Sequence, residues 1–151
     1  MSTTSVRENK ALVQRVVDLW NTGDVAAHDA CLAADYANRD PNNPEVTDFA
    51  GYKRWAAAAR AAFPDLQVTI EDLIGEGDRV AKYWSFVATH RGEFAGAAPT
   101  GKRVTWSGVT IYRFAGGKAA ECIWRTDALG LLLQLGAVSL ATAPVAVGAA
   151  R

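Results

Sequence analysis

The strongest constraint in this sequence is a change of hydrophobic period at Pro64. Before this proline, apolar residues recur every three or four positions along an expected helix: Leu12, Val13, Val16, Val17 and Trp20. After it, apolar and polar residues alternate in four segments rich in β-branched and aromatic residues: LQVTIEDLI, RVAKYWSFVATH, KRVTWSGVTIYRF and KAAECIWRTD. Helices followed by a strand meander predict an α+β domain.

The helical half is expected to contain three N-terminal helices. The first spans residues 6–21, Asp24 caps a second that runs to about residue 34, and Thr47 or Asp48 caps a third over FAGYKRWAAAARAAF. His28 is expected on the exposed side of the second helix. The links GEGD and AGGK join neighbouring strands as tight hairpins. The predicted architecture is a curved antiparallel β-sheet that wraps around the three helices and leaves a pocket.

The composition limits the class of partner. The 151 residues, half of them hydrophobic, suit one domain over residues 1–137 and a flexible C-terminal tail over residues 138–151. Lysine plus arginine equals aspartate plus glutamate at 16 each, so no net charge attracts nucleic acid or an acidic membrane. The N-terminal segment has no apolar core of the length that a signal peptide requires, and no stretch approaches the length of a membrane span. Two histidines without clustered cysteines make no zinc site. We expect a cytoplasmic protein that binds a small hydrophobic substrate and no metal.

Alternation along the strands groups the candidate site residues by face. Arg125 and Asp127 share one face of the last strand, and Trp124 lies on the other. Parity alone does not decide which face points inward. We expect an apolar cavity into which Asp127 opens, although core packing is the simpler interpretation for any one tryptophan. The substrate-binding side chains expected to line this cavity, besides Arg125, are Trp20, Trp55, Trp84, Trp106, Thr110 and Tyr112.

Several segments, in this order, resemble the SnoaL-like polyketide cyclase family of the nuclear transport factor 2-like fold: NTGD, GDRVAKYW, THRGEFAGAAPTGKRV, RFAGGKAAECIW and DALGLLLQLGA. The resemblance covers residues 6–137 and implies a cone-shaped α+β fold, a homodimer and an enzyme without a cofactor. It also implies that Asp127 acts as general base and then general acid in an intramolecular aldol ring closure, with His90 and Asn38 at matching positions. Thr110 and Gly108 stand where the cyclases carry a histidine and a glutamine.

The chemistry of an aldol closure explains why a buried Asp127 would suit it. One carboxyl group can take the proton from carbon and later protonate the alkoxide. Aspartate in water has a pKa of about 3.9, and apolar burial raises that pKa toward the range that a carbon acid requires. Arg125 would oppose this effect if it paired with Asp127, or would instead bind a substrate carbonyl. The alternative role for Asp127 is a cap for the segment that begins at Ala128.

His90 and Asn38 each have two interpretations. His90 donates to a substrate carbonyl or shuttles a proton, or else it shapes the HRGEF turn through a backbone contact. Asn38 donates to the substrate or serves as a turn residue. We favour a polyketide cyclase-like lyase or isomerase of the kind used in antibiotic biosynthesis. Three alternatives use the same pocket: a cofactor-free hydroxylase, an epoxide hydrolase that uses Arg125 and Asp127, and a ligand-binding module without turnover.

Overall fold

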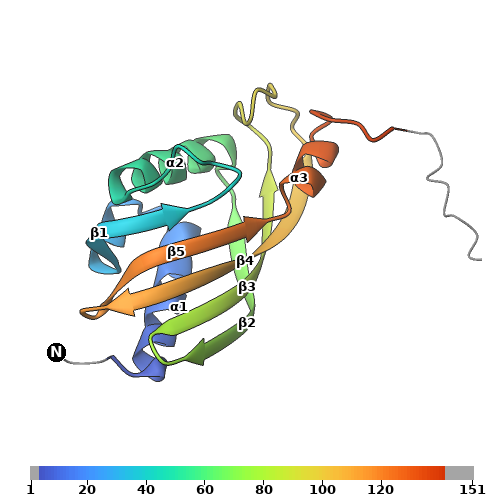
Figure 1. Ribbon diagram of the computed structural model, residues 1–151. Coiled ribbons are helices and arrows are strands. Elements are labelled where there is room, and N and C mark those ends of the chain that lie inside the picture. Colours follow the sequence, from blue (N-terminus) through green and yellow to red (C-terminus); the bar gives the residue numbers. More distant parts are fainter. Residues whose placement is uncertain (1–3, 142–151) are drawn as a thin grey trace, which may run out of the picture.

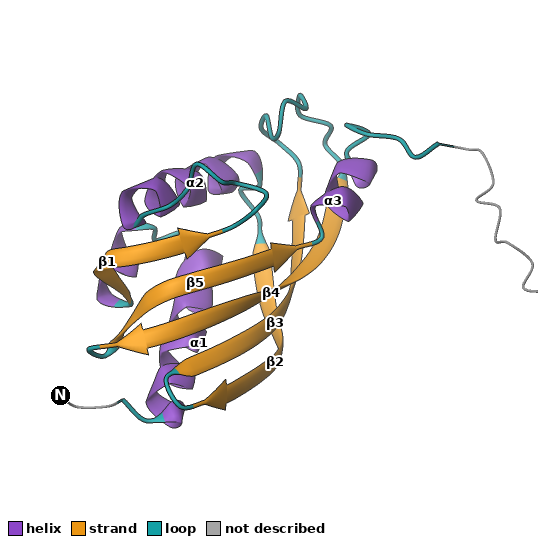
Figure 2. Ribbon diagram, viewed as in Figure 1, coloured by secondary structure: helices purple, strands orange, loops and turns teal. Residues whose placement is uncertain are grey.

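The computed structural model describes residues 4–141, in which helices pack against a strongly bent sheet (Figure 1 and Figure 2). The sheet order is β1-β5-β4-β3-β2, with β1 parallel to β5 and the other pairs antiparallel. The expected α+β class is confirmed. Residues 142–151 of the predicted tail lie outside the described residues. In chain order the elements are α1 (Val6–Thr22), the 3₁₀ helix η1 (Ala26–Ala30), β1 (Leu32–Arg39), α2 (Phe49–Ala62), β2 (Gln67–Glu76), β3 (Arg79–Thr89), β4 (Arg103–Ala115), β5 (Lys118–Thr126) and α3 (Ala128–Gln134).

Local signals in the sequence set both long helices. The Ser5 hydroxyl accepts from the Glu8 N–H at 3.2 Å and the Glu8 carboxylate accepts from the Ser5 N–H at 2.7 Å, which closes a capping box before α1. Gly23 ends α1 in the left-handed conformation with φ 77°. Asp48 caps α2 by accepting from the Gly51 N–H at 2.7 Å. The first and third predicted helices are therefore confirmed, and none of the described helices has the length and apolarity needed to cross a bilayer.

The second predicted helix is wrong beyond its first turn. Asp24 does accept a backbone N–H at 3.0 Å, but the turn that follows is only the five-residue η1. The chain then enters β1, which pairs in parallel with β5 and shifts register after Leu32. In this strand the buried residues Leu32, Tyr36 and Asn38 share one face, but the buried row includes a polar asparagine and the other face carries alanines. The contrast between apolar and polar positions that would have marked a strand is therefore weak. The sheet is mixed because the edge of β5 supplies backbone partners to β1.

His28 is buried, contrary to the expectation of an exposed position. It is 1% exposed, and its ring centroid lies 6.1 Å from that of Trp20 and 5.5 Å from that of Tyr52. Neither ring nitrogen has a hydrogen-bond partner among the described residues. Burial lowers the pKa of His28 to about 4, against the opposing charges of Asp24 and Asp29. The neutral imidazole therefore packs as an aromatic core residue at neutral pH.

The four predicted meander strands are confirmed as β2 to β5. Gly116 and Gly117 form the β4–β5 turn with φ 58° and 80°, the left-handed conformation that such hairpins require. Along β3 every second residue faces the core, and this inner row carries one lysine among apolar side chains: Val80, Lys82, Trp84, Phe86 and Ala88. The bent sheet therefore brings a charged group and several aromatic rings to the same interior face.

Candidate active site

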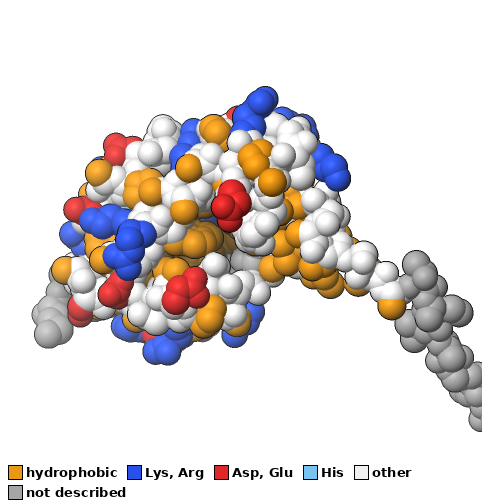
Figure 3. All heavy atoms as spheres, turned by 90° about the horizontal axis from the view of Figure 1, so that it is seen from above, with side chains coloured by type: hydrophobic (Ala, Val, Ile, Leu, Met, Phe, Trp, Pro, Cys, Tyr) orange, Lys and Arg blue, Asp and Glu red, His pale blue; other side chains and the backbone are white. Residues whose placement is uncertain are grey.

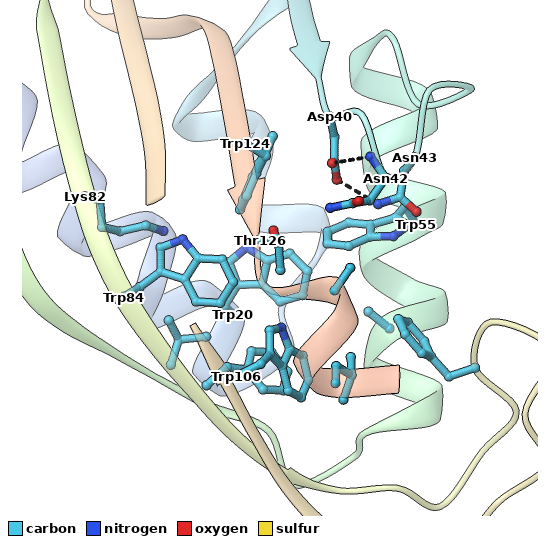
Figure 4. A pocket seen from close by; sticks show the side chains of 16 residues that line it. Trp20, Asp40, Asn42, Asn43, Trp55, Lys82, Trp84, Trp106, Trp124 and Thr126 are labelled. Atoms are coloured by element: carbon cyan, nitrogen blue, oxygen red, sulfur yellow. Dashed lines mark hydrogen bonds between the residues drawn. The ribbon is translucent and has the colours of Figure 1, made fainter. Parts of the chain in front are cut away.

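A pocket lies between the inner face of the sheet and the helices, and its wall is mostly aromatic. Figure 3 shows hydrophobic side chains at the bottom of a hollow in the surface, and Figure 4 shows the pocket from close by. The cavity volume is about 90 Å³. Since an engineered cavity of about 150 Å³ holds benzene, the enclosed part accepts at most one ring, and a larger ligand would extend into the mouth. The lining residues are Trp20, Trp55, Ala59, Val68, Trp84, Phe86, Phe94, Trp106, Trp124, Ala128 and Leu131, with Asp40, Asn42, Asn43, Lys82 and Thr126 as polar groups.

All five tryptophans of the chain line this pocket. Trp106 stacks on Phe86 with 3.7 Å between ring centroids, and Trp55 meets Trp20 edge to face at 5.6 Å. Buried acceptors fix the ring orientation of three indoles, so their apolar faces are presented to the cavity. Each indole N–H donates a hydrogen bond: Trp20 to the Tyr52 hydroxyl at 2.9 Å, Trp84 to the Thr110 hydroxyl at 3.0 Å and Trp124 to the Asn38 carboxamide oxygen at 2.9 Å.

Asn38 supports the pocket wall and does not line it. Its carboxamide oxygen accepts from the Tyr36 hydroxyl at 2.7 Å and from the Trp124 indole, while its amide donates to the Val46 carbonyl oxygen at 2.9 Å. These contacts use the side chain inside the protein. This geometry does not support the expected direct contact with substrate, because Asn38 lies outside the pocket lining and holds the Trp124 indole.

Thr110 and Tyr112 are likewise behind the wall. The Thr110 hydroxyl is fully buried under the Trp84 indole, and the Tyr112 hydroxyl accepts from Lys82 at 3.0 Å. Gly108 makes room for the same indole, since a Cβ there would lie 2.6 Å from an atom of Trp84. Neither Thr110 nor Tyr112 lines the pocket, so the expected ligand contacts are replaced by positioning contacts.

Asp127 and Arg125 were expected at the cavity, but neither side chain opens into it. Trp124 and Thr126 occupy the inner face at the end of β5, so alternation turns Arg125 and Asp127 to the exposed outer side. The Asp127 carboxylate accepts from the Gly130 N–H at 2.9 Å and caps α3. The Arg125 guanidinium donates to the Trp124 carbonyl oxygen at 2.6 Å. The capping interpretation of Asp127 thus describes its geometry, although its neighbours Thr126 and Ala128 line the pocket.

Replacing Asp127 by alanine is expected to lower the free energy of unfolding by about 1 kcal/mol, because α3 loses its N-cap. Asp127→Asn is the matched variant, since asparagine caps a helix as well as aspartate does. Urea denaturation of both variants measures the difference. Equal stability of the alanine and asparagine variants would contradict the capping role.

His90 shapes the loop between β3 and β4 and lies outside the pocket wall. Its Nδ1 accepts from the Thr100 N–H at 3.2 Å and lies 3.0 Å from the Thr100 hydroxyl, while its ring packs on Phe63 at 5.5 Å. The Nε2 atom has no partner among the described residues. The structure therefore favours the turn-shaping interpretation over contact with substrate, and the same loop carries Phe94 to the pocket.

Lys82 and Asp40 are the ionisable pocket residues that the sequence prediction missed. Lys82 is 2% exposed, and burial lowers its pKa to about 8. The sequence could have indicated Lys82, because it lies two residues before Trp84 and therefore points to the same face of β3. Asp40 follows β1, the strand that was not predicted, and lies at the pocket with Asn42 and Asn43. In Figure 4 the Asp40 carboxylate accepts from the Asn42 N–H at 2.9 Å and from the Asn43 side-chain amide at 2.7 Å.

Comparison with known proteins gives one family and many similar structures. The model of the SnoaL-like polyketide cyclase family matches residues 10–135. AclR, proposed as a hydroxylase, from Streptomyces galilaeus is 34% identical with a TM-score of 0.82, over 89% of this chain and 100% of that one. A protein proposed as a polyketide cyclase from Acidithiobacillus ferrooxidans is also 34% identical, with a TM-score of 0.78 over 92% and 100% of the two chains.

IdmH, proposed as a polyketide cyclase, from Streptomyces antibioticus is more distant, at 26% identity and a TM-score of 0.74 over 85% of this chain and 98% of that one. No curated protein matches the sequence. The similar structures share the nuclear transport factor 2-like fold expected for this chain.

Proposed function

Because the chain belongs to the SnoaL-like polyketide cyclase family, we propose that it is an enzyme that binds a flat, hydrophobic carbonyl compound in the tryptophan-lined pocket. The proposed reaction is an acid/base step of the aldol type, a ring closure or a related lyase or isomerase step. The homodimer implied by the family resemblance and the cytoplasmic location expected from the composition stay predictions.

The aromatic wall carries this proposal. Five indoles and two phenyl rings surround a cavity that has only a few polar groups, an arrangement suited to a planar ligand that stacks on or meets aromatic edges. The indole N–H groups of Trp20, Trp84 and Trp124 already have partners in the protein. The wall is therefore preorganised, and a ligand binds without first having to break these hydrogen bonds.

Asp40 is the proposed acid/base group. It lines the pocket, and its two hydrogen-bond donors, Asn42 and Asn43, hold the carboxylate oxygens in place. A fixed carboxylate can take a proton from the carbon next to a carbonyl group and return it to the alkoxide. Asp127 is the rival for this role through the family resemblance. It would have to leave its capping contact with Gly130 to reach the ligand, and this geometry favours Asp40.

Product analysis tests the proposed reaction. The protein is incubated with an aromatic polyketide-type compound that carries a reactive methylene group between two carbonyl groups and a third carbonyl within ring-closing reach. Ring closure is expected to give a product of unchanged mass or one that has lost water, at a rate above that of the buffer. Tight binding with no turnover of such compounds would contradict the enzymatic proposal and favour the ligand-binding module.

A cofactor-free hydroxylase is the second candidate, and the similarity to AclR favours it. Both reactions can begin with the same removal of a proton, because an enolate can attack a carbonyl group or react with dioxygen. Oxygen uptake during turnover and an ¹⁸O atom from ¹⁸O₂ in the product would identify the hydroxylase. Without an added reductant the balanced reaction converts a CH₂ group to a carbonyl group and releases the second oxygen atom as water. The epoxide hydrolase alternative has less support, since Arg125 and Asp127 lie on the outer side of β5.

A further inference from the structure

Among the described residues, the Lys82 ammonium group is a buried cation without a counter-ion. Figure 4 shows its side chain reaching from β3 toward the tryptophans of the pocket. Within residues 4–141 no carboxylate lies at ion-pair distance from it, and the Tyr112 hydroxyl at 3.0 Å is its one hydrogen-bond acceptor. An ammonium group has three N–H donors, so two are left for a ligand.

The titratable groups packed against Lys82 supply no negative charge. The Asp40 carboxylate lines the same pocket, but within residues 4–141 it makes no ion pair with Lys82. Burial raises the pKa of the Tyr112 hydroxyl well above its ordinary range and raises the pKa of the Cys122 thiol to about 12. His28 interacts electrostatically with Lys82, and its pKa of about 4 leaves it uncharged at neutral pH. A buried charge with only neutral neighbours is costly unless a partner of opposite charge arrives.

Aromatic faces compensate part of this cost. The Lys82 nitrogen lies 5.3 Å from the ring centroid of Tyr112 and 5.7 Å from that of Trp124, within the range of cation–π attraction. With a pKa of about 8, Lys82 stays mostly protonated at neutral pH. The pocket thus presents a positive charge beside flat apolar walls, a combination that matches an anion carried on a planar ring.

We propose that Lys82 recognises an ionisable hydroxyl group on an unsaturated carbon, a phenol or an enol, and binds it as the oxyanion. The O–H bond of the ligand breaks, its proton leaves to water, and the oxyanion accepts hydrogen bonds from the ammonium group. This inference rests on the proposed function only in placing the ligand in the same pocket. It narrows the substrate class to acidic polyphenols and enolised dicarbonyl compounds, and it applies equally to ring closure and hydroxylation.

Binding of two single-ring probes tests the proposal without any turnover. 4-Nitrophenol ionises to a phenolate that absorbs visible light, whereas 4-nitroanisole has the same ring and no ionisable hydroxyl group. Each probe is titrated near neutral pH into the wild-type protein, Lys82→Met and Lys102→Met. Lys102 is exposed, so its substitution makes the same charge change outside the pocket. Lys82→Met removes a buried charge and keeps a similar side-chain length, so the fold is expected to persist.

Lys82→Met is expected to weaken nitrophenolate binding at least tenfold and to raise the pKa of the bound phenol. Its affinity for 4-nitroanisole is expected to change less than threefold, and Lys102→Met is expected to match the wild type for both probes. Equal losses for both probes, or no loss for either, would overturn the proposal. If the wild type binds only 4-nitroanisole, the inference fails and the proposed pocket stands; if it binds neither probe, both fail.

Discussion

Replacing Asp40 by asparagine is expected to lower the turnover number for a ring-closing substrate by about 100- to 10,000-fold, the usual contribution of a positioned acid/base group. The asparagine side chain has nearly the same size and can still accept from the Asn42 N–H, which is 2.9 Å from Asp40 in the wild type. It cannot take up the proton from carbon. The affinity for substrate is therefore expected to change much less than the turnover number.

Asp127→Asn is the matched control, since it makes the same chemical change at an exposed cap of α3. We expect it to keep turnover within about threefold of the wild type, because asparagine preserves the cap. Steady-state kinetics on one substrate gives the turnover number and KM for the wild type and both variants. The reverse result, with an inactive Asp127→Asn and an active Asp40→Asn, would return the acid/base role to Asp127.

Lowering the pH from 7 to 4.5 is expected to remove about 2 kcal/mol of stability through His28 alone. The folded-state pKa of about 4 lies below the unfolded value of 6.5, so the unfolded chain binds the proton first as the pH falls. The contribution is fully present above pH 6.5 and is lost as the pH drops through the window down to about 4. The cause is burial of an imidazole that has no hydrogen-bond partner among the described residues.

His28→Phe isolates this effect, because phenylalanine keeps the aromatic contacts with Trp20 and Tyr52 and does not titrate. Urea denaturation at pH 7 and pH 4.5 gives the free energy of unfolding for both proteins. The wild type is expected to lose about 2 kcal/mol more than the variant between the two pH values. Carboxylates that also titrate in this range are common to both proteins and cancel in the comparison. The same loss in both proteins would show that His28 does not titrate differently on folding.

The sequence predicted those elements whose signals are local. Each meander strand carries its own alternation, and α1 and α2 carry caps that the structure shows as hydrogen bonds from Glu8 to Ser5 and from Gly51 to Asp48. β1 has no such clear local signal, because alanines and a buried asparagine weaken its apolar–polar contrast, and its partner β5 lies some eighty residues later in the chain. Such a strand forms because of its pairing with a distant segment, and the pairing of β1 with β5 brings the following residue, Asp40, to the pocket.

The face of β5 shows where strand parity stops being informative. Ile123 and Trp124 are both apolar and lie on opposite faces, so composition does not tell which face is inner. The structure turns Trp124 inward, and Asp127 consequently lies outside the cavity. In β3 the inner row is clearer from sequence, because Trp84 and Phe86 are both large and apolar while Ser85 and Thr89 on the other face are polar. Lys82 shares the parity of Trp84 and Phe86 and could have been placed in the pocket from sequence on that ground.

A crystal structure with bound 1-naphthol tests most directly whether the tryptophan-lined pocket is the ligand site. We predict electron density for the naphthol ring in contact with Trp84 and Trp124, with the second ring toward the mouth near Asp40. Density for the ring on another surface, with the pocket empty at a saturating ligand concentration, would contradict this role of the pocket.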